Sequence, residues 1–189
     1  MATGSTNTSS YNAQTGKNLL LGAGCLYKNY GLVGEAPIGA TAGGSTFNCA
    51  VKTRDVKCDG LKGLQKGLRV VTDVDITLTT TLLEINPSTL ALSLIGDIDT
   101  VTNPDYDIIS GRYEILDADY VTNIALVATI SGSAKPVIII ISNALATDGL
   151  KLVTKDDNDN GLATVFTAFG DPLTPTIVPY EIRYPKQVV

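Results

Sequence analysis

Apolar and polar residues alternate most regularly in the stretch DVDITLTTTL, which covers residues 73–82. A period of two places successive side chains on opposite faces of a strand, and valine, isoleucine and threonine favour extended backbone. The stretch therefore predicts a half-buried strand. Its apolar face should point into a core, and its polar face is unusually uniform. That polar face consists of Asp73, Asp75, Thr77, Thr79 and Thr81.

Shorter apolar or alternating runs predict further strands on both sides of this one. Turn residues separate most of them at the spacing that is typical of sandwiches and barrels. The first run, LLLGAGCLYKNY at 19–30, should bend at its two glycines. The other expected strands are Thr46–Val56, Tyr106–Leu116, Asn123–Ser131, Val137–Asn143, Leu150–Thr154, Leu162–Ala168 and Ile177–Tyr184.

A single helix is expected after the alternating strand. Asn86 can cap its start, Pro87 suits the first helical position, and Gly96 can end it. The glycine-rich residues 31–45 and the acidic residues 97–107 are expected to be loops. The fold class is thus mainly β, an antiparallel sandwich or partial barrel with one packed α-helix. Residues 1–17 should form a flexible polar arm and residues 18–189 a single domain.

The composition excludes several kinds of site. The chain has 189 residues, a formal charge of −5 and no histidine, so Ser-His, Cys-His and His-zinc sites cannot occur. Cys25, Cys49 and Cys58 form no CxxC pair and are interpreted as small apolar residues in a reducing cytosol. The glycine-free apolar runs are too short to cross a bilayer, so no membrane segment is expected.

No pattern predicts catalysis or a cofactor. Asp73 and Asp75 would share a strand face, but nothing supplies a partner base or an oxyanion hole. Asp156–Gly161 (DDNDNG) resembles the first half of a calcium loop, yet Thr167 stands where the bidentate glutamate should be. A hairpin turn explains that stretch more simply. The chain is therefore expected to be neither an enzyme nor a metal protein.

The stretch DGLKGLQKGLRV, at 59–70, concentrates glycine and positive charge. Its spacing fits neither the GxxxxGK[ST] phosphate loop nor the GxGxxG dinucleotide turn. Residues 52–69 hold six basic and two acidic side chains, a net charge of +4, whereas residues 73–119 hold ten acidic side chains and one basic. No aromatic residue is interleaved for base stacking. This opposition favours contact between copies of the chain over nucleic-acid binding, with a solvated connection as the alternative.

Three segments, in order, carry a resemblance to a known family. They are the loop YGLVGEAPIGATAGG, the connection DGLKGLQKGL and the strand end LLEI before a proline. Together they resemble the major tail (tail tube) proteins of long-tailed, non-contractile bacteriophages. Ala42 departs from the basic residue expected there. The matching residues are Tyr30, Gly31, Gly34, Glu35, Gly39, Ala40, Thr41, Gly43, Gly44, Asp59, Gly60, Gly63, Lys66, Gly67, Leu68, Leu82, Leu83, Glu84, Ile85 and Pro87.

The resemblance implies a subunit that assembles as stacked, hexameric rings into the hollow tube that delivers a genome. The connection would contact the next ring through Lys57, Asp59, Gly60, Lys62, Gly63, Lys66, Gly67 and Arg69. The polar face of the alternating strand (Asp73, Asp75, Thr77, Thr79 and Thr81) would be a candidate lining of the lumen. An acidic lining would let DNA slide without adsorbing, because adsorption requires basic contacts that release counterions.

Partners and location also follow from the resemblance. The chain would bind itself, a tape-measure protein, a tail-tip or initiator complex and a tail terminator, with double-stranded DNA in transit and no cofactor. It would be assembled in the host cytoplasm and reside in the virion tail. Two alternatives stay open: the tube of a phage-tail-like bacteriocin or injection system, and a monomeric capsid-decoration or binding domain. The small number of aromatics and the absence of tryptophan argue against a sugar-binding module.

Overall fold

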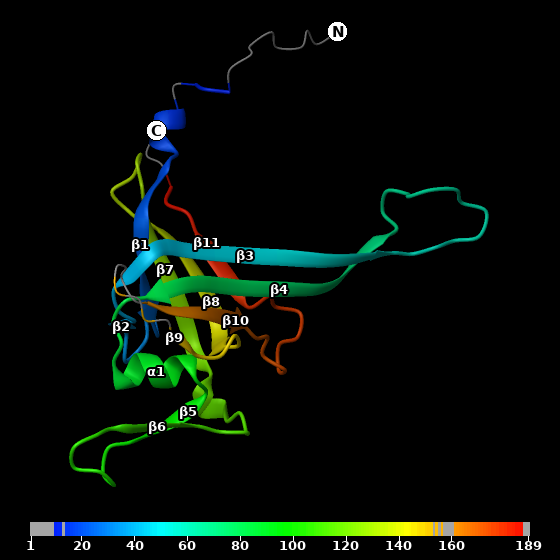
Figure 1. Cartoon of the computed structure of the whole chain (residues 1–189). Coiled ribbons are helices and arrows are strands. Elements are labelled where there is room, and N and C mark those ends of the chain that lie inside the picture. Colours follow the sequence, from blue (N-terminus) through cyan, green and yellow to red (C-terminus); the bar gives the residue numbers. More distant parts are fainter. Residues whose placement is uncertain (1–9, 13, 153, 155, 157–160, 187–189) are drawn as a thin grey trace.

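Antiparallel strands make up most of the chain, as the sequence predicts (Figure 1). The computed structural model describes residues 10–12, 14–152, 154, 156 and 161–186. The strands are β1 (Leu20–Lys28), β2 (Ala36–Pro37), β3 (Thr41–Asp55), β4 (Arg69–Leu82), β5 (Gly96–Asp99), β6 (Ile108–Gly111), β7 (Val121–Ile130), β8 (Val137–Ala146), β9 (Lys151–Leu152), β10 (Leu162–Ala168) and β11 (Tyr180–Arg183). The helices are α1 (Pro87–Ser93) and the short 3₁₀ turns η1 (Thr15–Lys17) and η2 (Asp117–Asp119).

One large sheet has the strand order β2-β1-β7-β8-β10-β4-β3. The strand β8 is shared, because its first half pairs with β11 and its last residues pair with β10. The strand β9 pairs with β10 outside this order. At the other end of the order β1 also packs near β3, so the sheet curls around its core. This curvature matches the expected partial barrel.

The strand β4 supplies the centre of the core. Ile76, Leu78 and Leu82 are at most 1% exposed, and the alternate residues point to solvent. They pack with apolar residues of β1, β7, β8 and β10, which include Leu26, Ile124, Ile141 and Phe166. The half-buried strand predicted from the period of two is therefore confirmed.

The helix α1 begins as expected but ends earlier. The Asn86 side chain accepts a hydrogen bond from the Thr89 N–H at 2.9 Å, and the Thr89 hydroxyl accepts one from the Asn86 N–H at 3.0 Å. This reciprocal capping box satisfies two backbone donors that a helix leaves open. Gly96 does not end the helix: the last helical residue is Ser93, and Gly96 is already the first residue of β5.

The acidic segment after α1 is a hairpin as well as a loop. Residues 96–99 pair with residues 108–111 to form a second, two-stranded sheet, so the expectation of a loop over 97–107 is wrong at its start. The strand expected over Tyr106–Leu116 is correspondingly short. The strand β6 ends at Gly111, although the Arg112 N–H still donates to the Ile95 carbonyl.

Other strand ends differ by a few residues. The strand β3 begins at Thr41 and not at Thr46, because a register shift between Ala42 and Thr46 carries the ladder past Gly43 and Gly44. Two expectations lie largely outside the described residues. They are the flexible N-terminal segment expected over 1–17, of which only 10–12 and 14–17 are described, and the turn over 156–161.

Two parts of the molecule project from the large sheet (Figure 1). The strands β3 and β4 continue beyond the sheet as a long two-stranded ribbon that ends in a loop. The β5–β6 hairpin lies beyond α1, at a different end of the molecule. The separation of these projections decides which contacts one chain can make with itself.

Candidate assembly surfaces

The ribbon formed by the outer parts of β3 and β4 is exposed on both of its faces. We call residues 51–71, with the loop at their tip, the arm. Residues 51–55 and 69–71 are all exposed, although inside the sheet alternate side chains are buried in β4 and half-buried in β3. Val51 is 54% exposed, Val71 59% and Leu64 74%. A two-stranded ribbon without a covered face is marginally stable alone, so the ion pairs between its strands matter for its order.

Two clusters of ion pairs hold the strands of the arm together. The Arg69 guanidinium donates to both carboxylate oxygens of Asp55, at 2.9 and 3.2 Å. Hydrogen bonds from Arg69 lower the pKa of Asp55 below its ordinary value. Nearer the body, Lys52 Nζ lies 3.1 Å from an Asp73 oxygen and 2.6 Å from an Asp75 oxygen. Hydrogen bonds from Lys52 and from the Val74 N–H lower the pKa of Asp73.

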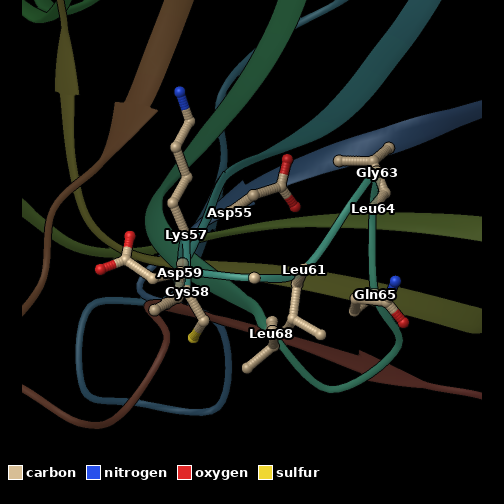
Figure 2. A pocket seen from close by; sticks show the side chains of 11 residues that line it. Asp55, Lys57, Cys58, Asp59, Leu61, Gly63, Leu64, Gln65 and Leu68 are labelled. Carbon is tan, nitrogen blue, oxygen red and sulfur yellow. The ribbon is translucent and has the colours of Figure 1, made fainter.

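The tip of the arm is a hollow loop (Figure 2). A hydrogen bond from the Val56 N–H to the Leu68 carbonyl, 2.7 Å long, closes its base. Beyond that bond, the chain surrounds a cavity of about 540 Å³ lined by side chains that include Leu61, Leu64 and Leu68. Gly60, Gly63 and Gly67 take positive φ angles of 83°, 78° and 91° there, which suits glycine.

All eight residues of the expected contact loop lie on the arm. Lys57, Lys62 and Lys66 carry exposed ammonium groups without an ion-pair partner among the residues that the structure describes. Arg69 differs, because it is the first residue of β4 and already pairs with Asp55. The free positive charge of the arm therefore lies on Lys57, Lys62, Lys66 and Arg54, because Lys52 is paired with Asp73 and Asp75. The other members of the loop are Asp59, Gly60, Gly63 and Gly67.

The expected polar face of β4 is real, but its charge is smaller than the sequence implied. Asp73, Asp75, Thr77, Thr79 and Thr81 all lie on the face opposite the core and are exposed or half-buried. The strand β3 places Lys52 beside both aspartates, so the acidic end is partly neutralised. Sequence reasoning had counted Lys52 with the basic loop. The remaining face carries the hydroxyls of Thr77, Thr79 and Thr81. Thr46 and Val165 flank Thr79, Asn48 lies beside Thr77, and Lys151 lies across Ala163 from Thr81.

These carboxylates do not resemble a catalytic pair. A general acid needs a raised pKa, whereas hydrogen bonding lowers that of Asp73. Both aspartates are also engaged by one lysine on an open surface. Within the described residues, no group of three histidine, cysteine, aspartate or glutamate side chains could hold a metal ion. The three cysteines are free thiols, and Cys58 is exposed on the arm and thus not a core residue.

The acidic β5–β6 hairpin is a surface that sequence reasoning missed as a unit. We call residues 96–111 the acidic hairpin: it contains Asp97, Asp99, Asp105 and Asp107 and no basic residue. Its apolar side chains are also exposed, with Val101 at 88% and Tyr106 at 73%. Two features of the sequence could have indicated the hairpin. They are the alternation Asp97-Ile98-Asp99 and the short apolar run Ile108-Ile109 that follows it.

Arg112 anchors this hairpin to the segment that follows it. Its Nε atom lies 2.9 Å from an Asp97 oxygen, and its guanidinium also binds Asp119. Asp99 accepts hydrogen bonds from the N–H groups of Val101 and Thr102, at 2.9 and 3.0 Å. Asp105 and Asp107 have no ion-pair partner among the described residues. Asp99 has no ion-pair partner among these residues either, so three carboxylates of the hairpin are without a cation.

Comparison with known proteins adds no identification. No protein-family model matches the chain, and no match was found among curated proteins. Among the described residues, no helix is long and apolar enough to cross a membrane.

Proposed function

We propose that this chain is a structural subunit that assembles through its arm into rings and a hollow tube, as the tail tube proteins it resembles do. The single observation that carries the proposal is the arm itself. It is a long ribbon with apolar side chains exposed on both faces and unpaired lysines at its tip. Such a surface is costly for a solitary protein and useful for one that is buried by a neighbour.

Charge supports contact between identical copies. The arm is basic and the chain as a whole has a formal charge of −5. A basic projection on one copy therefore meets a mainly acidic surface on the next, which favours association and sets its direction. In the assembled tube, the threonine-rich face of β4 would line the channel. A surface of hydroxyl groups with few free cations gives DNA little to adsorb to.

Electron microscopy of the purified protein across a concentration series, with light scattering alongside, tests the proposal. Rings or hollow tubes of uniform width are the expected result. Where the protein alone stays monomeric, the series is repeated with tail-tip complexes as seeds. Monomers that persist with seeds would contradict the proposal and favour a decoration or binding domain.

A charge-reversed variant tests the role of the arm. Lys62→Glu/Lys66→Glu should leave the circular dichroism spectrum unchanged and abolish rings and tubes. Arg69 is left intact because its ion pair with Asp55 holds the arm together. The matched control is Lys135→Glu/Lys151→Glu, which makes the same change in net charge at two exposed lysines outside the arm. Normal tubes from the arm variant would show that these arm lysines are not needed for assembly.

A further inference from the structure

The acidic hairpin is the part of the surface that best complements the arm. Residues 96–111 carry four aspartates and no cation, and residues 52–69 carry a net charge of +4. Both segments also expose apolar side chains: Leu61 and Leu64 on the arm, Val101 and Tyr106 on the hairpin. Matched charge around exposed apolar groups is the usual composition of an interface, in which apolar burial supplies free energy and charge fixes the register.

A groove lies directly beside the hairpin. It is bordered by the start of α1, β2 and β5 and has a volume of about 550 Å³. Its lining is apolar and polar, with two carboxylates, Glu84 and Asp107, and one cation, Lys28. Leu92 and Ile98 form part of its apolar lining, and Asp107 supplies a carboxylate from the loop. Thr100, an exposed residue of the same loop, also lines it. The groove thus offers apolar contact and a free negative charge together.

The arm of the same chain cannot occupy this groove. The arm extends away from the sheet, and the hairpin lies beyond α1 at another end of the molecule (Figure 1). An arm with two paired strands, braced by Asp55–Arg69 and by Lys52, does not fold back on itself. The occupant must therefore come from another copy. Because donor and receptor are different surfaces, the contact is heterologous and can repeat into a ring or a filament.

We propose that the groove between α1 and the acidic hairpin receives the arm tip of a second copy. Leu61 and Leu64 of the incoming tip enter the groove, and Lys62 and Lys66 pair with Asp105 and Asp107 around it. The inference rests on the proposed function and names the surface to which the arm binds. One such contact is small, and several made at once by subunits of a ring add up through their high effective concentration.

Charge reversal on both sides tests the pairing. Asp105→Lys/Asp107→Lys reverses the two hairpin charges proposed to make the contact, and Lys62→Glu/Lys66→Glu reverses the two arm charges opposite them. Each variant alone should fail to assemble, because like charges then face each other at these contact positions. An equimolar mixture should assemble again, because the reversed arm of one variant meets the reversed hairpin of the other and the two unaltered surfaces also match. Assembly is read by light scattering and electron microscopy.

The outcomes distinguish an error in the proposed receptor groove from an error in the proposed tube function. Wild-type tubes together with normal tubes from the hairpin variant would overturn the receptor and leave the tube function standing. The receptor groove would also be overturned if the wild-type protein assembled and the equimolar mixture of the two variants did not. Recovery in the mixture, when each of the two variants alone stays unassembled, would establish the pairing.

A covalent trap tests the same contact without requiring tubes. Thr100→Cys places a thiol in the groove, and the native Cys58 is exposed near the arm tip. A mild oxidant removes two electrons and two protons as one disulfide forms between them. Peptide mapping should find the link from Cys58 to position 100 between chains, and Cys58→Ser should abolish it. The link without tubes would keep the receptor and overturn the tube function, whereas absence of the link would overturn the receptor.

Discussion

At the scale of single residues, a buried pair of hydroxyls joins α1 to the large sheet. Ser93 Oγ donates to the Thr89 carbonyl at 2.9 Å and lies 3.0 Å from Thr164 Oγ1. Since the only proton of the Ser93 hydroxyl is used within the helix, Thr164 must be the donor between them. Both side chains are at most 1% exposed. Because of this direction, removing the Ser93 hydroxyl and removing the Thr164 hydroxyl should have different costs in stability.

Removing Ser93 should cost more than removing the hydroxyl of Thr164. Ser93→Ala leaves a buried donor on Thr164 without its partner, a loss of about 1 to 3 kcal/mol. Thr164→Val keeps the shape and leaves Ser93 bonded to the helix, so it should cost at most about 1 kcal/mol. Urea unfolding of both variants measures the difference. Equal losses, or a double variant less stable than Ser93→Ala, would refute this reading of the bond.

Gly24 gives a second prediction, because β1 and β7 approach closely there. Its φ is +76°, and a Cβ atom would lie 2.8 Å from Leu126 Cδ1 and 3.1 Å from the Val127 carbonyl oxygen. Gly22 has a similar φ of +80° and open space around it. Gly22→Ala should therefore cost about 1 to 2 kcal/mol for backbone strain alone. Gly24→Ala should cost about 1 to 3 kcal/mol more, because the neighbours must move.

The matched pair separates strain from crowding. Chemical denaturation of both variants gives the two free energies of unfolding. If Gly24→Ala lost no more stability than Gly22→Ala, the bend in β1 would not bring the strands as close as these distances require.

At the scale of elements, the arm should respond to acid before the sheet does. The pKa values of Asp55 and Asp73 are lowered by hydrogen bonds from Arg69 and Lys52. A group with a lowered pKa in the folded state stabilises the fold above its ordinary pKa. That contribution is lost as the pH falls through the lowered value. Amide hydrogen exchange in residues 51–55 and 69–73 should then rise relative to the core residues of β4, after correction for intrinsic rates.

The matched variant for this prediction is Asp55→Asn. It removes the charge that titrates and keeps the shape of the side chain. Its arm should already exchange faster at neutral pH and gain little more on acidification. An arm that keeps its protection at low pH in the unaltered protein would contradict a role for these ion pairs.

The elements also show what the sequence could and could not predict. The strand β4 was predictable because one of its faces is buried, and burial imposes a period of two that any reader of the chain can see. The strand β5 was not, because its four residues are half aspartate and its partner β6 lies nine residues further on. The start of β3 was hidden by Gly43 and Gly44, which permit the register shift that lets the ladder continue.

The site divides in the same way. The basic loop was visible as a local excess of lysine, and its eight residues do lie together on the arm. The ion pairs that remove Lys52 and Arg69 from that excess depend on which residues oppose each other across β3 and β4. Such register is a property of the folded sheet, and a count of charges along the chain cannot supply it.

At the scale of the whole molecule, the proposed tube predicts which surface turns inward. If the arm and the acidic hairpin contact other copies, as proposed, the polar outward face of β4 is the candidate lining of the channel. Thr79 lies in the middle of that face, between Thr46 of β3 and Val165 of β10. A thiol at this position would report where the face lies after assembly.

We expect Thr79→Cys, in a Cys58→Ser background, to react differently with small and large reagents once tubes have formed. The free subunit should react with both a small maleimide and one attached to a bulky polymer. Tubes should admit the small reagent and exclude the large one, because a channel passes small molecules along its axis and a polymer cannot enter. The Cys58→Ser protein alone corrects for Cys25 and Cys49. Reaction with both reagents would place the β4 face outside the tube, and reaction with neither would bury it between subunits.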